Sequence, residues 1–418
     1  MRFYIVKKAK ILTSRPFRAL ILPCFAVELL LTSQGVFGAE WVAAPTVQIK
    51  AQYDDNLYLN TGSHNSVWGG TVSPRLTLSR NEENNALNLE GRLMLNNYSN
   101  SSVNDSNAQI LTLGGHYQTE RDKWHLSSYF QRDTTETTVS GVVPSSNGQL
   151  SDQSADIDVN LVPIKVRRNR FYLRPSWTHS LSERSALSVD YRLYQSTFAN
   201  TGGNGLIDYR HQDITAGLNH SITERDWVGV TASASIYEAL ESGGTNSHGY
   251  GISANWSHQF SQTLRGNAAI GSRTTTTKVG GQNQDTHGLL FDANLVKRYS
   301  ELTTYRINIG RSVQPSGAGV VQSDQVRVQW FRNLSPRMAG YLWGTFFHNK
   351  ALGQLSSTAN RTYYSLEPGL RWSLTRRWSL DGSYRYRRQK YDNSSKSAAS
   401  NAVFIAVSYD WPRIAASR

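Results

Sequence analysis

Residues 175–194 read PSWTHSLSERSALSVDYRLY, and their pattern predicts the fold of the whole chain. A four-residue polar segment, 182–185, separates two runs in which apolar and polar residues alternate: Pro175, Trp177 and Leu181 precede it, and Leu187, Val189, Tyr191 and Leu193 follow it. Strict alternation predicts a strand with one apolar and one polar face. A short polar break between two such strands predicts a β-hairpin.

The same hairpin pattern recurs along the chain. Short turns opened by Ser or Thr are predicted at 80–84, 119–123, 182–185, 223–226, 261–264, 300–303, 335–338 and 375–377. Recurrence of one supersecondary unit along a chain is a strong architectural signal. The repeating unit is therefore one hairpin.

Longer connections separate these hairpins and are rich in Gly, Ser, Asn and Thr, for example NTGGNGL, ESGGTNSHG, KVGGQNQDT, QPSGAGV and DNSSKSAAS. Short turns at one end and long polar loops at the other are typical of an outer-membrane barrel. We therefore predict an all-β fold, a transmembrane antiparallel up-and-down β-barrel of about 18 strands. Its short turns and both termini are expected in the periplasm, and its longer loops outside.

The composition agrees with membrane strands rather than membrane helices. Only 39% of the 418 residues are hydrophobic, and the mean hydropathy is −0.48. Beyond the first forty residues, no apolar run has the length of a membrane helix, whereas barrel strands give a much weaker signal per segment. Aromatic residues near strand ends are expected in interfacial girdles: Trp124, Trp227, Trp330, Tyr363, Trp372 and Trp378. The last strand, 401–411, places Val403, Ile405, Val407, Tyr409 and Trp411 on its outward face.

The first 39 residues have the layout of a secretory signal peptide. Basic residues precede the apolar run 19–31, and the small residues of GVFGA follow it, with cleavage expected after Gly38 or Ala39. A membrane anchor is the alternative. Cleavage removes Cys24, the single cysteine, and takes the net charge from +13 to +8 by removing six basic residues and one acidic residue. The mature barrel is thus expected to span 40–418, with about six residues before its first strand and no plug domain.

Alternation also predicts the residues that face the lumen. Its candidate anion-facing residues are Arg75, Arg92, Arg174, Arg192, Arg306, Arg327, Arg371, Arg385 and Arg387, together with Lys50. The lumenal carboxylates are fewer: Glu90, Asp190, Asp292, Glu367 and Asp381. An excess of positive charge on a low-dielectric wall favours anions. The alternative is that each arginine pairs with a carboxylate and merely hydrates the wall. Tyr129, Tyr172, Tyr194 and Tyr237 are expected on the same face, where aromatic rings suit sugars.

One connection stands out by its length, from residue 135 to residue 166. Long loops without secondary structure are usually functional or disordered. Asp152, Asp156 and Asp158 make this segment acidic, so it is a candidate constriction loop that folds inward against the arginines. A disordered external loop is the alternative.

The sequence gives no signal for catalysis, for a metal or for a cofactor. His179, His220 and His258 recur beside the periplasmic turns, which indicates interfacial polar residues rather than ligands. Ser247 and His248 are adjacent on an extended chain and point in opposite directions, so no catalytic dyad follows. Nucleic acid is not expected as a partner, because the arginines are spread over many strands rather than gathered in one patch.

The start of the predicted barrel carries a family resemblance. Tyr53 precedes Asp55 and Asn56, and the next strand contains Pro74, Leu76 and Leu78 in a P-x-Φ-x-Φ pattern. In these motifs the chain resembles the β-barrel porins encoded in exopolysaccharide operons. The resemblance implies a conduit in the outer membrane of a Gram-negative bacterium. It also implies a polysaccharide substrate and periplasmic export or synthesis proteins as partners.

Three functions follow from these observations. The leading hypothesis is an export channel for exopolysaccharide. The first alternative is a general or sugar-selective diffusion porin, and the second is a structural or adhesive surface barrel. In each case the barrel contacts outer-membrane lipid and lipopolysaccharide, and its oligomeric state is open.

Overall fold

The computed structural model describes residues 40–99, 107–135, 166–199, 206–241, 245–279, 282–317, 319–352 and 360–417. These residues form nineteen strands of one antiparallel sheet: β1 Glu40–Asp54, β2 Val67–Asn81, β3 Asn85–Tyr98, β4 Ala108–Gln118, β5 Asp122–Thr134, β6 Arg167–Ser180, β7 Ser185–Phe198, β8 Tyr209–Ser221, β9 Asp226–Ala239, β10 Asn246–Ser261, β11 Leu264–Val279, β12 Gln282–Ser300, β13 Thr303–Ser316, β14 Gly319–Ser335, β15 Met338–Ala351, β16 Arg361–Ser373, β17 Trp378–Tyr391, β18 Ser397–Asp410 and β19 Ile414–Ser417. Within the described residues, no helix is long and apolar enough to cross a bilayer.

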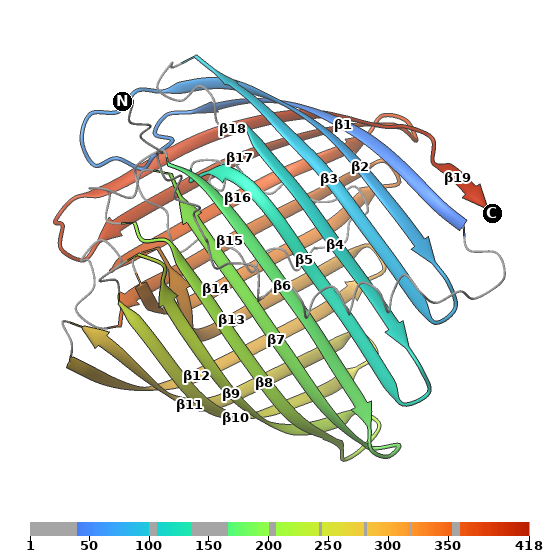
Figure 1. The fold of residues 1–418 in the computed structure, drawn as a ribbon. Coiled ribbons are helices and arrows are strands. Elements are labelled where there is room, and N and C mark those ends of the chain that lie inside the picture. Colours follow the sequence, from blue (N-terminus) through green and yellow to red (C-terminus); the bar gives the residue numbers. More distant parts are fainter. Residues whose placement is uncertain are drawn as a thin grey trace, which may run out of the picture.

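The sheet closes on itself as a barrel of eighteen strands (Figure 1). Each strand from β2 to β17 pairs with its sequence neighbours, and β1 closes the ring by pairing with both β2 and β18. The predicted up-and-down barrel is confirmed. Closure leaves no open sheet edge, which a membrane requires because bilayer hydrocarbon offers no hydrogen-bond partners.

The two chain ends of the barrel differ from expectation. β1 begins at Glu40 rather than several residues later, and its first four residues pair with β19. The sequence predicts that the segment after Trp411 trails beyond the last strand. Instead, Pro412 interrupts the ladder, and Ile414–Ser417 resumes it along the same edge of β1.

All eight predicted short turns join neighbouring strands, from the β2–β3 turn at 82–84 to the β16–β17 turn at 374–377. Two predicted long loops are wrong. β11 continues to Val279 and β12 starts at Gln282, while β13 continues to Ser316 and β14 starts at Gly319. The β-branched run Thr274–Thr277 maintains the ladder with β12, so the polar composition of this segment belongs to strand rather than loop.

The predicted alternation places apolar side chains on the outside. On β18, Val403 and Ile405 are exposed outward, whereas Ala402, Phe404 and Ala406 are buried on the lumenal side. Trp124, Trp372 and Trp378 are exposed at strand ends, as an aromatic girdle requires. The girdle prediction is wrong for Tyr363 and Trp227. Tyr363 is buried and stacks on Phe347, and Trp227 lies on the same strand face as the lumenal residue Ser235.

The connection between β1 and β2, residues 55–66, folds into the external end of the lumen. We call it the latch. Leu57 packs against Val67 and Tyr98, and Leu59 packs against Phe347, Tyr363 and Ala398. Leu59 has a φ of 53°, an unfavourable conformation for a leucine that this packing holds in place.

Hydrogen bonds fix the latch to the wall. The Asn56 side chain donates to the carbonyls of Asn60 and Ala399 at 2.9 and 3.0 Å, and accepts from the Asn60 amide.

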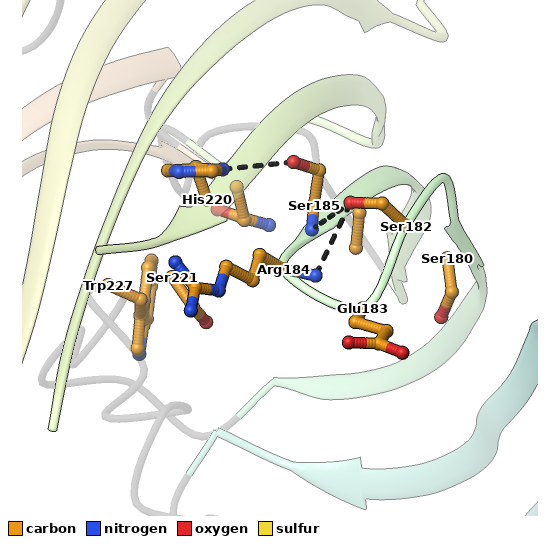
Figure 2. A pocket seen from close by; sticks show the side chains of 10 residues that line it. Ser180, Ser182, Glu183, Arg184, Ser185, His220, Ser221 and Trp227 are labelled. Carbon is orange, nitrogen blue, oxygen red and sulfur yellow. Dashed lines mark hydrogen bonds between the residues drawn. The ribbon is translucent and has the colours of Figure 1, made fainter. Parts of the chain in front are cut away.

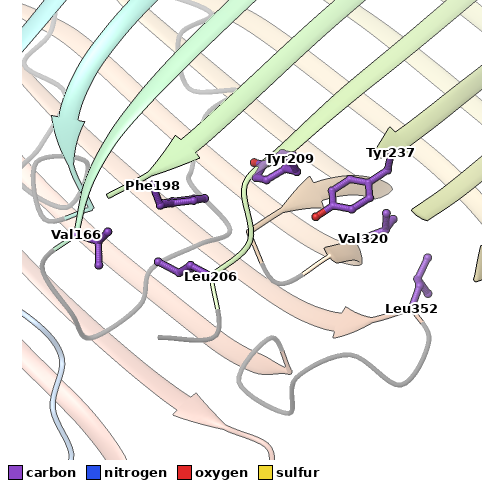
Figure 3. Close-up of a cluster of buried hydrophobic side chains, with 7 residues drawn as sticks. All are labelled: Val166, Phe198, Leu206, Tyr209, Tyr237, Val320 and Leu352. Atoms are coloured by element: carbon purple, nitrogen blue, oxygen red, sulfur yellow. The ribbon is translucent and has the colours of Figure 1, made fainter. Parts of the chain in front are cut away.

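A second structure crosses the external end from the other side. We call it the apolar bridge: Val166, Phe198, Leu206, Tyr209, Tyr237, Val320 and Leu352 (Figure 3). It joins the tip of the β13–β14 hairpin to the β7–β9 wall. The Ile207 amide donates to the Gly317 carbonyl at 2.8 Å, and the Tyr237 hydroxyl donates to the Ser316 carbonyl at 3.0 Å. Two described segments therefore narrow the external end from opposite sides.

Candidate functional site

The lumen wall is the candidate functional site. The nine arginines singled out in the sequence all occupy lumenal strand faces, because the strand register places each of them opposite other inward-facing residues. Their surroundings differ strongly, and this difference divides the lumen into two walls. Whether each arginine faces an anion stays a prediction.

We define the positive wall as the lumenal face of β1–β3 and β15–β18. At its centre, Arg75 on β2 lies directly opposite Arg92 on β3. Arg92 donates to the Ser73 hydroxyl at 2.9 Å, and in the described part of the chain neither guanidinium forms an ion pair. Glu90 is two residues from Arg92 on the same face. Like charges directly opposite each other repel, so across this strand pair neither guanidinium charge is cancelled by its neighbour.

Further cations adjoin this pair on the positive wall. The Lys50 ammonium lies 5.2 Å from the centre of the Phe404 ring, and the Arg385 guanidinium lies 4.7 Å from the same ring. Both side chains are buried, at 5% exposure each. The Arg385 guanidinium adds to the positive potential of this wall.

Asp54 anchors the external end of the positive wall. It is fully buried and accepts from Arg387 at 2.8 Å and from the Ser400 hydroxyl at 2.8 Å, while Arg385 lies 3.7 Å away. Arg387 also donates to the Leu57 carbonyl at 3.3 Å. Arg387 is thus enclosed beneath the latch and acts as a structural support for it.

The remaining predicted arginine of the positive wall, Arg371, lies nearer the periplasm. Arg371 donates to Asp381 at 3.3 Å, and Tyr341 donates to the same carboxylate at 2.8 Å.

We define the paired wall as the lumenal face of β5–β9. Here the charges alternate along one row: Arg174 contacts Asp190 at 2.6 Å, Asp190 contacts Arg192 at 3.5 Å, and Arg192 contacts Asp213 at 2.7 Å. The two arginine side chains are 48% and 47% exposed to the lumen. Their charges are balanced by the two carboxylates, as the alternative interpretation of the sequence expected.

Tyrosines accompany this row. Tyr129 and Tyr172 stack with ring centres 5.1 Å apart, Tyr194 and Tyr209 follow at 5.7 Å, and Tyr209 stacks on Tyr237 at 5.3 Å. The four predicted lumenal tyrosines therefore share one wall, and Tyr209 joins them. The external member, Tyr237, belongs to the apolar bridge.

The external edge of the paired wall holds an ion cluster that the sequence interpretation missed. Asp133 is fully buried and accepts two bonds from Arg168, at 2.9 and 3.0 Å, and one from Arg170 at 3.2 Å. Both arginines have the same parity as Arg174, so extending the alternation past the expected strand end would have found them. Asp54 and Arg361 also lie at strand ends, and the same extension of the alternation would have found them.

Arg306 and Arg327 lie between the two walls, on β13 and β14. Arg327 donates to Gln325 at 3.0 Å, and Arg306 is opposite Gln329 in the ladder. Both side chains are half-buried. The acidic residues Asp152, Asp156 and Asp158 lie outside the described residues, so the candidate constriction loop stays a prediction.

Each recurring histidine lies opposite the first residue of a strand that begins at the periplasmic end: β5, β7 or β9. His179 contacts Asp122 at 2.9 Å, His258 contacts Asp226, and His220 contacts Ser185 at 2.9 Å. Figure 2 shows the last pair beside a shallow pocket at the periplasmic rim. Ser185 occupies the position that aspartate holds in the other two hairpins. The Ser185–His220 contact therefore corresponds to the structural Asp–His contacts of those hairpins.

Comparisons with known proteins agree with a porin. Residues 237–410 match a family model described as "Putative beta-barrel porin 2". The resemblance drawn from the sequence is thereby confirmed over this part of the chain. A search of curated protein sequences found no match.

Several solved structures are similar to this chain over most of its length. OpdK of Pseudomonas aeruginosa, solved with vanillate, is 11% identical, with a TM-score of 0.45 over 90% of this chain and 99% of that chain. OccK2 (OpdF) of Pseudomonas aeruginosa, in complex with glucuronate, is 10% identical, with a TM-score of 0.45 over 89% and 98%. A BenF-like porin from Pseudomonas fluorescens Pf-5 is 9% identical, with a TM-score of 0.47 over 89% and 98%.

The closed barrel, its apolar outer face and the porin family match place the protein in the outer membrane of a Gram-negative bacterium. It is a porin-like channel protein.

Proposed function

We propose that the protein is a diffusion porin that favours small anionic solutes. The observation that carries this proposal is the Arg75–Arg92 pair, which faces the lumen without an ion-pair partner among the described residues. Arg385 extends the positive potential across the closure of the barrel, and Lys50 lies against the same Phe404 ring. An eighteen-strand barrel is wide enough for an aqueous pathway, and a charged wall of low dielectric raises the local concentration of counter-ions.

Exopolysaccharide export, the leading hypothesis from the sequence, gains no support from the architecture. The latch and the apolar bridge enter the external end from opposite walls, and both are held by buried contacts. Such fixed constrictions suit a channel that selects small solutes better than one that passes a growing polymer. The diffusion-porin alternative therefore fits better.

The test is the reversal potential of the refolded barrel in a planar bilayer under a potassium chloride gradient. We expect wild type to favour chloride, and Arg75→Glu/Arg92→Glu to lower the chloride-to-potassium permeability ratio by at least about twofold. The matched control is Lys278→Gln/Lys297→Gln, which removes two positive charges from the outward face. Unchanged selectivity in the Arg75/Arg92 variant, or equal loss in the control, would contradict the proposal.

A further inference from the structure

One sector of the outer face has an uneven charge distribution. At the external ends of β15–β18, four exposed cations gather: Lys350, Arg388, Lys390 and Lys396. We call them the basic patch. The even-numbered residues of β15 and β17 point away from the lumen, since their odd-numbered neighbours Asn349, Arg387 and Gln389 are buried inside. Lys396 lies in the connection between β17 and β18.

The ladder places Arg388 and Lys390 on adjoining outward-facing rungs of β17, with Lys350 two strands away on β15. Arg388 is opposite Tyr364 on β16 and opposite Ala399 on β18, and Lys390 is opposite Thr362 and Ser397. The Arg388 guanidinium is held by the Tyr364 hydroxyl at 3.2 Å and the Ser397 hydroxyl at 3.1 Å. These are neutral partners, so the full positive charge of Arg388 remains.

Carboxylates near the basic patch are few. Asp392 is exposed in the β17–β18 connection, and Asp55 accepts from the backbone and side chain of Asn401 at 2.7 and 2.8 Å. The neighbouring sector differs. On the outward face of β13 and β14, Arg311 forms an ion pair with Asp324. The basic patch is therefore a local excess of charge rather than a general property of the outer face.

The rungs at and below Arg388 follow the profile of a membrane leaflet. Tyr364 and Tyr386 contact each other with ring centres 6.1 Å apart, and Tyr384 is exposed beside them. Beneath these aromatic rings, Leu370 and Ile405 share a rung with Gly382 and are exposed to the outside. Apolar residues suit acyl chains, aromatic residues mark the interface, and the cations above them stand at the level of the lipid headgroups.

We propose that the basic patch binds a phosphorylated glycolipid of the outer leaflet, of the lipopolysaccharide type. The outer leaflet is the one that the external ends of the strands adjoin, and the phosphate groups of its glycolipid match four clustered cations in sign. Arginine binds phosphate in a bidentate manner and lysine binds it as a point charge, so the patch offers both modes. This proposal does not depend on which solute crosses the lumen.

The test measures glycolipid retention by the refolded full chain with native mass spectrometry in detergent. Lipid A with its phosphates is compared with phosphatidylglycerol, which is anionic but lacks the sugar headgroup. We expect lipid A to be retained in preference, and Lys350→Gln/Arg388→Gln/Lys390→Gln/Lys396→Gln to reduce its retention about tenfold or more. The charge-matched control replaces Lys123, Arg225, Lys278 and Arg298, four exposed cations elsewhere, with glutamine.

Equal retention of lipid A by the patch variant and by wild type would overturn the proposal. Equal affinity of wild type for phosphatidylglycerol would also overturn it, because the patch would then recognise any anionic lipid. A second measurement needs no variant: removal of the phosphates from lipid A is expected to lower its retention by wild type to the level of the patch variant. Undiminished retention of the dephosphorylated lipid would refute a phosphate site.

Discussion

Arginine side chains line both lumen walls, but their charges are cancelled on the paired wall and reinforced on the positive wall. On the paired wall, Arg174 and Arg192 alternate with Asp190 and Asp213, so the charges cancel over short distances. On the positive wall, Arg75 faces another arginine across the ladder. An arginine in a barrel lumen therefore says little about selectivity until its cross-strand neighbour is known, because the neighbour decides whether its field is cancelled or reinforced.

Burial separates the walls as well. Asp54 on the positive wall is fully enclosed with Arg387, whereas Asp190 on the paired wall is 19% exposed and its arginines are half exposed. Buried ion pairs are costly to break, since the remaining charge loses both its partner and its water. Exposed pairs are screened. The two walls should respond very differently to loss of a carboxylate.

The largest effect is expected from Asp54→Ala. Removing this carboxylate leaves Arg387 buried without its ion-pair partner, and the free energy of unfolding should fall by about 3–5 kcal/mol. Asp190→Ala, the matched change on the paired wall, should cost about 1 kcal/mol or less because its partners reach solvent. Urea titration of the barrel in detergent micelles, followed by tryptophan fluorescence, measures both. Equal costs for the two variants would show that burial does not distinguish the walls.

The next effect concerns the latch, which rests on the positive wall. Leu59→Ala removes the contacts with Phe347 and Tyr363 and should destabilise the folded latch by about 2–3 kcal/mol. A released latch opens the external end on that side, so single-channel conductance should rise. Thr61→Ala, an exposed change in the same segment, is the control and should leave conductance unaltered. If conductance were the same in all three proteins, the latch would not limit passage.

A smaller effect is expected when the carboxylates of the paired wall are removed, which turns it into a second positive wall. Asp190→Asn/Asp213→Asn leaves Arg174 and Arg192 uncompensated and half exposed, so the chloride-to-potassium permeability ratio should rise, by about twofold. Asp285→Asn, an exposed change on the outward face, is the control. A ratio that stays constant while Arg75→Glu/Arg92→Glu lowers it would confine selectivity to the positive wall.

Much of this comparison could be predicted from the sequence. A period of two places every residue of a strand on one face or the other, so alternation alone assigns Arg75, Arg174 and Arg387 to the lumenal face of their strands. The cross-strand neighbour could not be predicted, because register depends on where each turn places the next strand. The opposition of Arg75 and Arg92, and the alternation of Arg174 with Asp190, are therefore results of the structure.

The latch and the apolar bridge could not be predicted from the sequence either. The latch is short and polar in composition, and only Leu57 and Leu59 mark it as a segment with something to bury. The tip of the β13–β14 hairpin resembles an ordinary surface loop, although Gly317 lies against Phe198 and Leu206 of the opposite wall. Contacts across a lumen join residues far apart in the chain, and no local pattern encodes them.

The smallest effect is a pH response of the apolar bridge above the paired wall. Asp208 precedes β8, and burial raises the pKa of its carboxyl above the ordinary value of 3.8, although the Phe198 amide donates to it. A raised pKa in the folded state means that the folded bridge binds the proton more readily than the unfolded chain, so the bridge gains stability as the pH falls toward that value.

Hydrogen exchange measures this response. The Ile207 amide donates to Gly317 across the lumen. After correction for the intrinsic rate, its exchange should be slower at mildly acidic pH than at neutral pH, by less than about twofold. Asp208→Asn should abolish the difference, since the amide cannot titrate. Protection that weakens on acidification, or a pH dependence that persists in Asp208→Asn, would assign the response to another group and leave the two walls equally insensitive to pH.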